Sequence, residues 1–164
     1  RYLLNKAARE AGATKLVTGH NLDDEAQVIL MNLFKANTGL TAQLGPKTGV
    51  KEHELFVQRV KPLYFCTEKE TRLYAFLKGF TINFAECPNA QDGFRVSIRD
   101  MLNDFESTYK GTKQGLVRSF LTLLPALQKE AKTENSALQR CQMCGEPARK
   151  AVCNACALQE VLHA

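Results

Sequence analysis

The chain has 164 residues, of which 45% are hydrophobic and 24% are charged, and its formal net charge is +5. This composition indicates a globular protein, and no apolar run approaches the roughly 18 residues of a membrane-spanning helix, so we expect no membrane association. The first residues carry no signal-peptide pattern, which favours a cytoplasmic location. The mild excess of basic residues permits an anionic partner such as RNA without requiring one.

The first third of the chain predicts a helix, a strand and a second helix. Apolar residues recur on one face of a helix over residues 1–10, and Gly12 then ends it. Residues 15–18 predict a strand, and residues 23–36 predict a helix with apolar residues at helical spacing. This order predicts an α/β domain with a parallel sheet. Because the chain starts at Arg1 inside a helix that lacks a capping residue, we expect it to be part of a longer protein.

The middle of the chain predicts further helices and strands after a polar loop. The loop is expected over residues 38–54, which are rich in Gly, Thr and charged residues. Strands are expected over residues 56–60 and 81–85, and helices over residues 68–78 (capped by Thr67), 95–108 and 114–132. Pro125 is expected to kink or break the last helix. A polar linker at 132–136 then divides a main domain from a small carboxyl-terminal unit.

The segment between the first strand and the second helix is a candidate ligand site. Ligands of open α/β sheets bind at the carboxyl ends of the strands, and Gly19 would let a ligand approach the backbone there. Asn21 suits the cap of the helix, and three acidic residues follow it in the first helical turn, Asp23, Asp24 and Glu25. Two interpretations stay open. The carboxylates either complement the helix dipole, or one of them holds Mg²⁺ beside a triphosphate or orients a substrate.

Two isolated cysteines lie in the main domain. Cys87 ends a predicted strand just before Pro88, which is a suitable position for a functional residue. A lone cysteine is also a common small core residue, so both interpretations of Cys87 stay open. Cys66 has apolar neighbours and is expected to belong to the core.

The remaining four cysteines predict a metal site. Their spacing is Cys-x2-Cys-x8-Cys-x2-Cys, at Cys141, Cys144, Cys153 and Cys156. A two-residue gap lets a tight turn aim two thiolates at one point, and four thiolates suit tetrahedral Zn²⁺. Gly145 suits a turn that requires a positive φ. We predict one structural zinc ion that supplies most of the folding free energy of this tail, on the order of 10 kcal/mol. A redox dithiol or an iron–sulfur site is the alternative.

Taken together, these segments resemble a known family, the ATP-dependent tRNA 2-thiouridine synthetases of the PP-loop superfamily in their archaeal and thermophile form. The resemblance spans nearly the whole chain. It rests on Arg-Tyr-Leu-Leu-Asn at 1–5, Gly-His-Asn-Leu-Asp-Asp-Glu-Ala-Gln at 19–27, Arg-Val-Lys-Pro-Leu at 59–63, Glu-Cys-Pro at 86–88, Phe-Arg at 94–95, Arg-Asp at 99–100, Gly-Thr-Lys at 111–113 and the four-cysteine tail.

The resemblance implies a fold and a reaction. Residues 1–132 would form part of a Rossmann-like PP-loop ATPase domain, and residues 133–164 would form a small zinc ribbon. Enzymes of this family activate the C2 oxygen of a tRNA uridine by adenylation from ATP, and sulfur then displaces AMP. The implied partners are tRNA, a ubiquitin-like sulfur carrier protein or free sulfide as the sulfur donor, and a second copy of the chain in a homodimer.

The resemblance also implies roles for individual residues. By similarity, Gly19 and His20 would line the site for ATP and Mg²⁺, and Asp24 would assist adenylation. Cys87 would be the third thiolate of a [4Fe–4S] cluster, whose open iron carries the sulfur.

The sequence departs from the family in what the 164 residues lack. The Ser-Gly-Gly-x-Asp-Ser nucleotide loop, the amino-terminal zinc module and the Cys-x-x-Cys pair that would complete the cluster are all absent. We expect them upstream of Arg1, and we expect the chain alone to be inactive. Two rival interpretations remain: a non-catalytic RNA-binding or scaffold module with a zinc ribbon, and another PP-loop enzyme such as a lysidine-forming or cytidine-thiolating relative.

Overall fold

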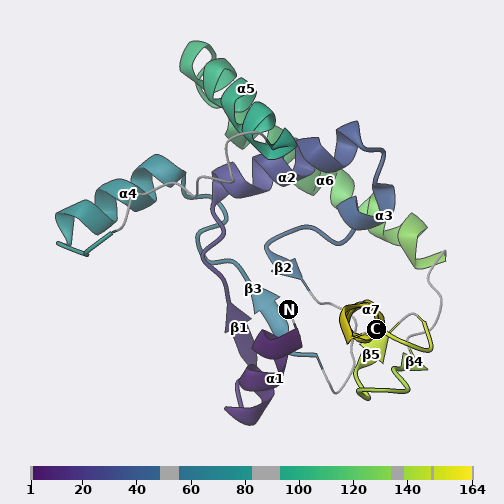
Figure 1. Ribbon diagram of the computed structural model, residues 1–164. Helices are drawn as coiled ribbons and strands as arrows, with labels where there is room; N and C mark the ends of the chain where they lie inside the picture. Colours follow the sequence, from purple (N-terminus) through teal and green to yellow (C-terminus); the bar gives the residue numbers. More distant parts are fainter. Residues whose placement is uncertain (1, 49–55, 83–92, 134–138, 149, 164) are drawn as a thin grey trace.

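The computed structural model describes residues 2–48, 56–82, 93–133, 139–148 and 150–163 (Figure 1). The helices are α1 (Tyr2–Glu10), α2 (Leu22–Phe34), α3 (Thr38–Thr41), α4 (Glu68–Leu77), α5 (Phe94–Thr108), α6 (Thr112–Thr133) and α7 (Asn154–His163). The strands are β1 (Lys15–Val17), β2 (Lys47–Thr48), β3 (Gln58–Val60), β4 (Gln139–Arg140) and β5 (Pro147–Ala148).

The main sheet has the order β1-β3-β2. β1 and β3 pair in parallel, with Leu16 opposite Arg59, and β2 pairs with β3 antiparallel. β1 therefore forms one edge of the sheet among the described residues, and its Val17 is largely exposed. The parallel pair and the helices around it confirm the predicted α/β class.

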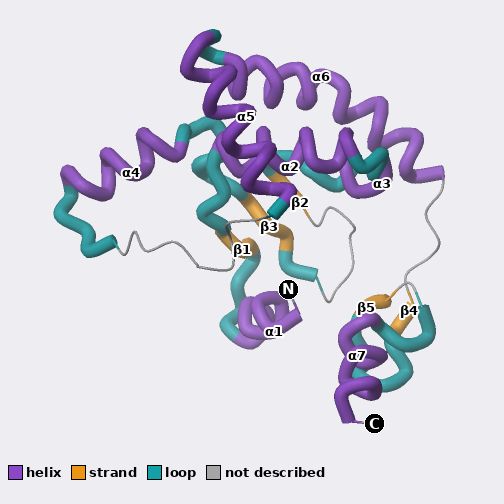
Figure 2. The backbone as a smooth tube through the Cα atoms, turned by 45° about the horizontal axis from the view of Figure 1, so that its top comes forward, coloured by secondary structure: helices purple, strands orange, loops and turns teal. Residues whose placement is uncertain are grey.

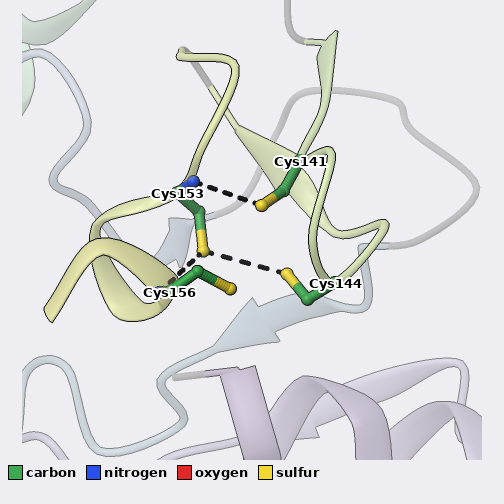
Figure 3. A group of neighbouring side chains, drawn as sticks. All are labelled: Cys141, Cys144, Cys153 and Cys156. Carbon is green, nitrogen blue, oxygen red and sulfur yellow. Dashed lines mark hydrogen bonds between the residues drawn. The ribbon is translucent and has the colours of Figure 1, made fainter. Parts of the chain in front are cut away.

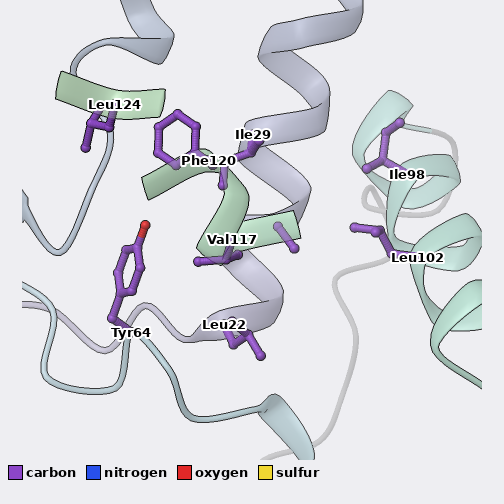
Figure 4. Packing of buried hydrophobic residues seen from close by; sticks show 9 residues of the cluster. Leu22, Ile29, Tyr64, Ile98, Leu102, Val117, Phe120 and Leu124 are labelled. Carbon is purple, nitrogen blue, oxygen red and sulfur yellow. The ribbon is translucent and has the colours of Figure 1, made fainter. Parts of the chain in front are cut away.

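Three helices form the core beyond the carboxyl end of β1. Figures 1 and 2 show α2, α5 and α6 lying together there, whereas α4 extends away from them and buries none of its residues. Each of the three helices contributes one apolar stripe at helical spacing. The buried cluster consists of Leu22, Ala26, Ile29, Tyr64, Ile98, Leu102, Val117, Phe120 and Leu124 (Figure 4).

A buried ion pair joins four helices at one point. Lys113, in the first turn of α6, donates to Asp23 in the first turn of α2, and both side chains are about nine-tenths buried. The same ammonium donates to Asn103 Oδ1 of α5 at 2.6 Å. The other carboxylate oxygen of Asp23 accepts a hydrogen bond from the backbone N–H of Glu68, where α4 begins, at 2.7 Å. This network sets the position of the first turn of α2 relative to its neighbours.

The carboxyl-terminal unit has its own small core, which contains Cys141, Ala148 and Cys156. β4 and β5 pair antiparallel beside α7 (Figure 2). Arg9 of α1 donates to Glu146 of this unit at 2.9 Å, and both side chains are partly buried. The unit is thus joined to α1 through an ion pair.

The elements that the sequence predicted within residues 1–132 agree with the structure except at three places. Residues 38–54 were expected to be a loop, but α3 and β2 lie within this range; the α3 turn is supported by Thr41 Oγ1, which donates to the carbonyl of Asn37 at 2.8 Å. The strand expected over 81–85 is not formed at residues 81 and 82, and residues 83–85 lie outside the described part. α6 continues through Pro125, because Phe120 and Leu124 hold this helix in the core. None of the helices in the described part of the chain combines the length and the hydropathy that a membrane span requires.

Replacing Lys113 with Met should lower the free energy of unfolding by about 3–5 kcal/mol, because the Asp23 carboxylate is then buried without its cation. Lys110→Met, an exposed lysine three residues earlier, is the matched control and should change stability by less than about 0.5 kcal/mol. Urea unfolding followed by circular dichroism measures both. Equal losses in the two variants would contradict the role of the buried pair.

Candidate functional site

The loop from β1 to α2 places Gly19 and His20 on the surface at the carboxyl end of β1. The N–H of Thr18 donates to the carbonyl of Val60 at 3.0 Å and continues the parallel pairing up to the loop. Gly19 and His20 are both exposed, and His20 Nδ1 lies 3.0 Å from Thr18 Oγ1. The loop therefore holds both residues where a ligand can reach them, as the sequence predicts, while their contact with ATP stays a prediction.

A capping box starts α2. Asn21 Oδ1 accepts the backbone N–H of Asp24 at 3.0 Å, and the N–H of Asn21 donates to Asp24 Oδ2 at 3.2 Å. The two bonds satisfy donors that the helix start would otherwise leave unpaired, so the local sequence itself fixes the direction in which the chain enters α2.

The three acidic residues of this turn have different partners. Asp23 is paired with Lys113 as described above, and Glu25 Oε1 accepts from Lys61 Nζ at 2.6 Å. Both of these carboxylates are buried. The side chain of Asp24 keeps 27% of its surface exposed, so it is the acidic residue of the three that solvent or a ligand can reach. The geometry thus gives Asp23 and Glu25 structural roles and leaves Asp24 as the candidate for chemistry.

Arg95 contacts this carboxylate from another helix. Its Nη2 donates to Asp24 Oδ1 at 2.6 Å, and its Nε donates to Gln27 Oε1 at 2.8 Å. Arg95 is the second residue of α5 and lies 71 positions from Asp24 in the sequence. The family resemblance includes Arg95, but no local pattern could have paired it with Asp24, because the contact depends on how α5 packs against α2.

The structure describes one of the two isolated cysteines, Cys66. Cys87 lies outside the described residues, so its role as a cluster ligand stays a prediction. Cys66 is half-buried, and its carbonyl accepts the N–H of Leu22 at 2.8 Å where α2 begins. Cys66 therefore supports the start of α2 through its backbone, but it lies outside the buried core cluster to which the sequence assigned it.

The four carboxyl-terminal cysteines converge on one point (Figure 3). Their sulfur atoms all lie within 4.8 Å of one another, and Cys144 Sγ is 3.8 Å from Cys153 Sγ. A tetrahedron with metal–sulfur bonds of about 2.3 Å has edges of about 3.8 Å, so the arrangement fits a four-coordinate metal ion. Gly145 has a φ of 71°, and its N–H donates to the carbonyl of Cys141 at 2.9 Å, which forms the expected tight turn.

Backbone donors favour a thiolate at Cys141. The N–H of Cys153 donates to Cys141 Sγ at 3.2 Å, and this bond, followed by that from Cys144, lowers the pKa of Cys141 to about 6. Hydrogen bonding to Cys153 and Cys144, reinforced by burial, raises the pKa of Cys156 to about 12. The raised pKa of Cys156 opposes four thiolates in one group, and a bound metal cation would offset this because it stabilises thiolate ligands.

Two comparisons with known proteins find that the chain is similar to tRNA-thiolating proteins. It is 35% identical to the tRNA 2-thiolation protein NcsA of Haloferax volcanii, over all of this chain and 53% of that protein. It is 35% identical to the tRNA-5-methyluridine(54) 2-sulfurtransferase of Pyrococcus horikoshii, over 95% of this chain and 49% of that protein. No family model matches the chain.

A solved structure is similar as well. The U34-tRNA thiolase NcsA from Methanococcus maripaludis, determined with its [4Fe–4S] cluster, is 32% identical and has a TM-score of 0.69. The match covers 89% of this chain and 45% of that one. The chain thus spans about half the length of the proteins it matches.

The four-cysteine group should bind one thiophilic divalent ion per chain. Cys144→Ser should reduce the bound metal to well below one ion per chain, and Cys66→Ser, a cysteine outside the group, should leave it at one. Acidification should release the ion, because protons compete with it for the thiolates. Elemental analysis after gel filtration at about pH 8 and pH 5 measures the number of metal ions bound per chain. If the Cys144→Ser variant still bound one ion per chain, the proposed site would be wrong.

Proposed function

Because the chain belongs to the tRNA 2-thiolation family, we propose that it is part of an enzyme that replaces the C2 oxygen of a tRNA uridine with sulfur. The observation that carries the proposal is the similarity along the whole chain to thiolases, together with a reachable carboxylate at the carboxyl end of a parallel strand. Since the chain spans about half of those relatives, we assign it a share of the site rather than the whole.

The proposed reaction has two displacements. The uridine O2 attacks the α-phosphorus of ATP, the bond to the β-phosphate oxygen breaks and pyrophosphate leaves. Sulfur then attacks C2, the C2–O bond breaks and AMP leaves with the oxygen. Adenylation turns a poor leaving group into a good one, so the protein has mainly to hold the two reactants in register.

The residues of the β1–α2 loop would contribute to the first displacement. Gly19 would let ATP approach the backbone, and the neighbouring His20 is exposed as well. Asp24 would hold Mg²⁺ or orient the uridine, since its carboxylate is fixed at the start of α2 yet remains partly exposed. These roles agree with the acidic first turn without requiring Asp23 or Glu25 to take part.

Two metal groups belong to the proposal. Four converging thiolates favour zinc as the structural ion of residues 133–164, with residues 1–132 as part of the ATPase domain. Cys87 would be one ligand of a [4Fe–4S] cluster whose other protein ligands this chain does not supply. When bound, such a cluster would carry the sulfur on an iron that no protein thiolate ligates.

The proposed partners follow from the same family. The substrate would be a tRNA, and the sulfur would come from a ubiquitin-like carrier protein or from sulfide. We also propose a cytoplasmic location and a homodimer for the complete enzyme.

The chain alone should form no 2-thiouridine, because it lacks a nucleotide loop, whereas the same chain joined to the remainder of its protein should form it. In the complete enzyme, Asp24→Asn should lower the rate by at least about 100-fold if the carboxylate acts in adenylation. Nucleoside mass spectrometry of digested tRNA measures the product. Thiolation by the 164-residue chain itself would overturn this prediction.

Cys87 can be tested separately from the reaction. Anaerobic reconstitution of the complete enzyme with iron and sulfide should give broad absorbance near roughly 400 nm, as thiolate-ligated clusters do, and Cys87→Ser should lower it. Cys66→Ser is the matched control and should leave the spectrum unchanged. An unchanged spectrum for the Cys87 variant would remove this residue from the cluster.

A further inference from the structure

The Asp24 carboxylate is held on both of its oxygens. Oδ2 accepts the N–H of Asn21, and Oδ1 accepts the guanidinium of Arg95. The first bond belongs to the capping box and is local to α2, but the second comes from α5. Its 2.6 Å length is short for a hydrogen bond between a guanidinium and a carboxylate, and such a contact restricts the rotamer of the acid.

The Arg95 guanidinium donates two hydrogen bonds to side chains of α2. Nε and Nη2 reach Gln27 and Asp24, which lie one helical turn apart on the same face of α2. A single ammonium on a flexible stem cannot reproduce this arrangement, because it lacks the rigid fork of donors. The choice of arginine at this position is therefore specific.

Stability alone accounts poorly for this contact. The side chains of Arg95 and Asp24 are 53% and 27% exposed, and ion pairs with that exposure contribute little to folding. The neighbouring pair of Glu25 and Lys61 is buried, with side-chain exposures of 3% and 9%. Within one helical turn, the structure thus has a buried pair that serves packing and a solvent-accessible pair at the carboxyl end of β1.

We propose that Arg95 is a positioning residue that holds the Asp24 carboxylate in one orientation for the adenylation step, acting through Asp24 rather than on the substrate. This inference rests on the proposed function. It also gives α5 a part in the site, because Arg95 ties the first turn of that helix to the first turn of α2.

The test compares variants of the complete enzyme: Arg95→Ala, Arg95→Lys, Asp24→Asn and the double variant of Asp24→Asn with Arg95→Ala. Arg95→Ala should lower kcat at least about tenfold and change the KM for ATP less than about threefold, because a misplaced carboxylate affects the transition state more than ground-state binding. Arg95→Lys should recover part of the loss. The double variant should be no slower than Asp24→Asn alone, within about twofold, since Arg95 acts through that carboxylate.

A control variant and three possible results decide whether Arg95 has this role. Arg118→Ala, an exposed arginine of α6, is the control and should match the wild type in rate and in thermal midpoint. A wild-type rate for Arg95→Ala, an effect on KM alone, or a double variant slower than Asp24→Asn by the full Arg95→Ala factor would overturn the positioning role. If Arg95→Ala does not fold, Arg95→Lys decides the question by the same kcat and KM comparison. A wild-type enzyme that forms no 2-thiouridine would instead overturn the proposed function.

Discussion

The buried contact between Asp23 and Lys113 is the constraint on which the site depends. It lies where α2, α4 and α6 begin and where α5 passes, so one carboxylate and one ammonium set the relative positions of four helices. Burying a charge pair costs free energy unless each donor and acceptor of the pair has a hydrogen-bond partner. The side chains around the pair must therefore lie in well-defined positions. The position of the next residue, Asp24, follows from that geometry.

Three consecutive acidic residues serve different purposes because a helix turns by about 100° per residue. Asp23 and Glu25 point into the protein and meet lysines, whereas Asp24 points toward the surface and meets Arg95. In the sequence these three residues look as if they only complement the helix dipole. In the structure, two buried carboxylates that bind lysines flank one carboxylate that remains accessible. The similarity to thiolases favours the enzyme over a scaffold module, and Asp24 is the carboxylate of the three that a ligand can reach.

Local chemistry explains how much of this was visible in the sequence. Helical spacing and capping residues predicted α1, α2, α4 and α5 almost to the residue, and cysteine spacing predicted the metal site, because each signal lies within one turn or loop. The partners of Asp23, Asp24 and Glu25 were not predictable, since they lie 90, 71 and 36 positions away and depend on packing. α3 and β2 were missed for the related reason that short elements in a polar segment carry little pattern.

The edge position of β1 has a consequence for the behaviour of the isolated chain in solution. Among the described residues, β1 has a strand on one side only, and the apolar side chains of Leu3, Leu4 and Val17 nearby are largely exposed. An unpaired strand edge next to exposed apolar side chains can pair with a strand of another molecule and so promote aggregation. The solubility of this polypeptide therefore depends on whether a further strand covers the free edge of β1. Measuring its solubility would show whether the sheet is complete.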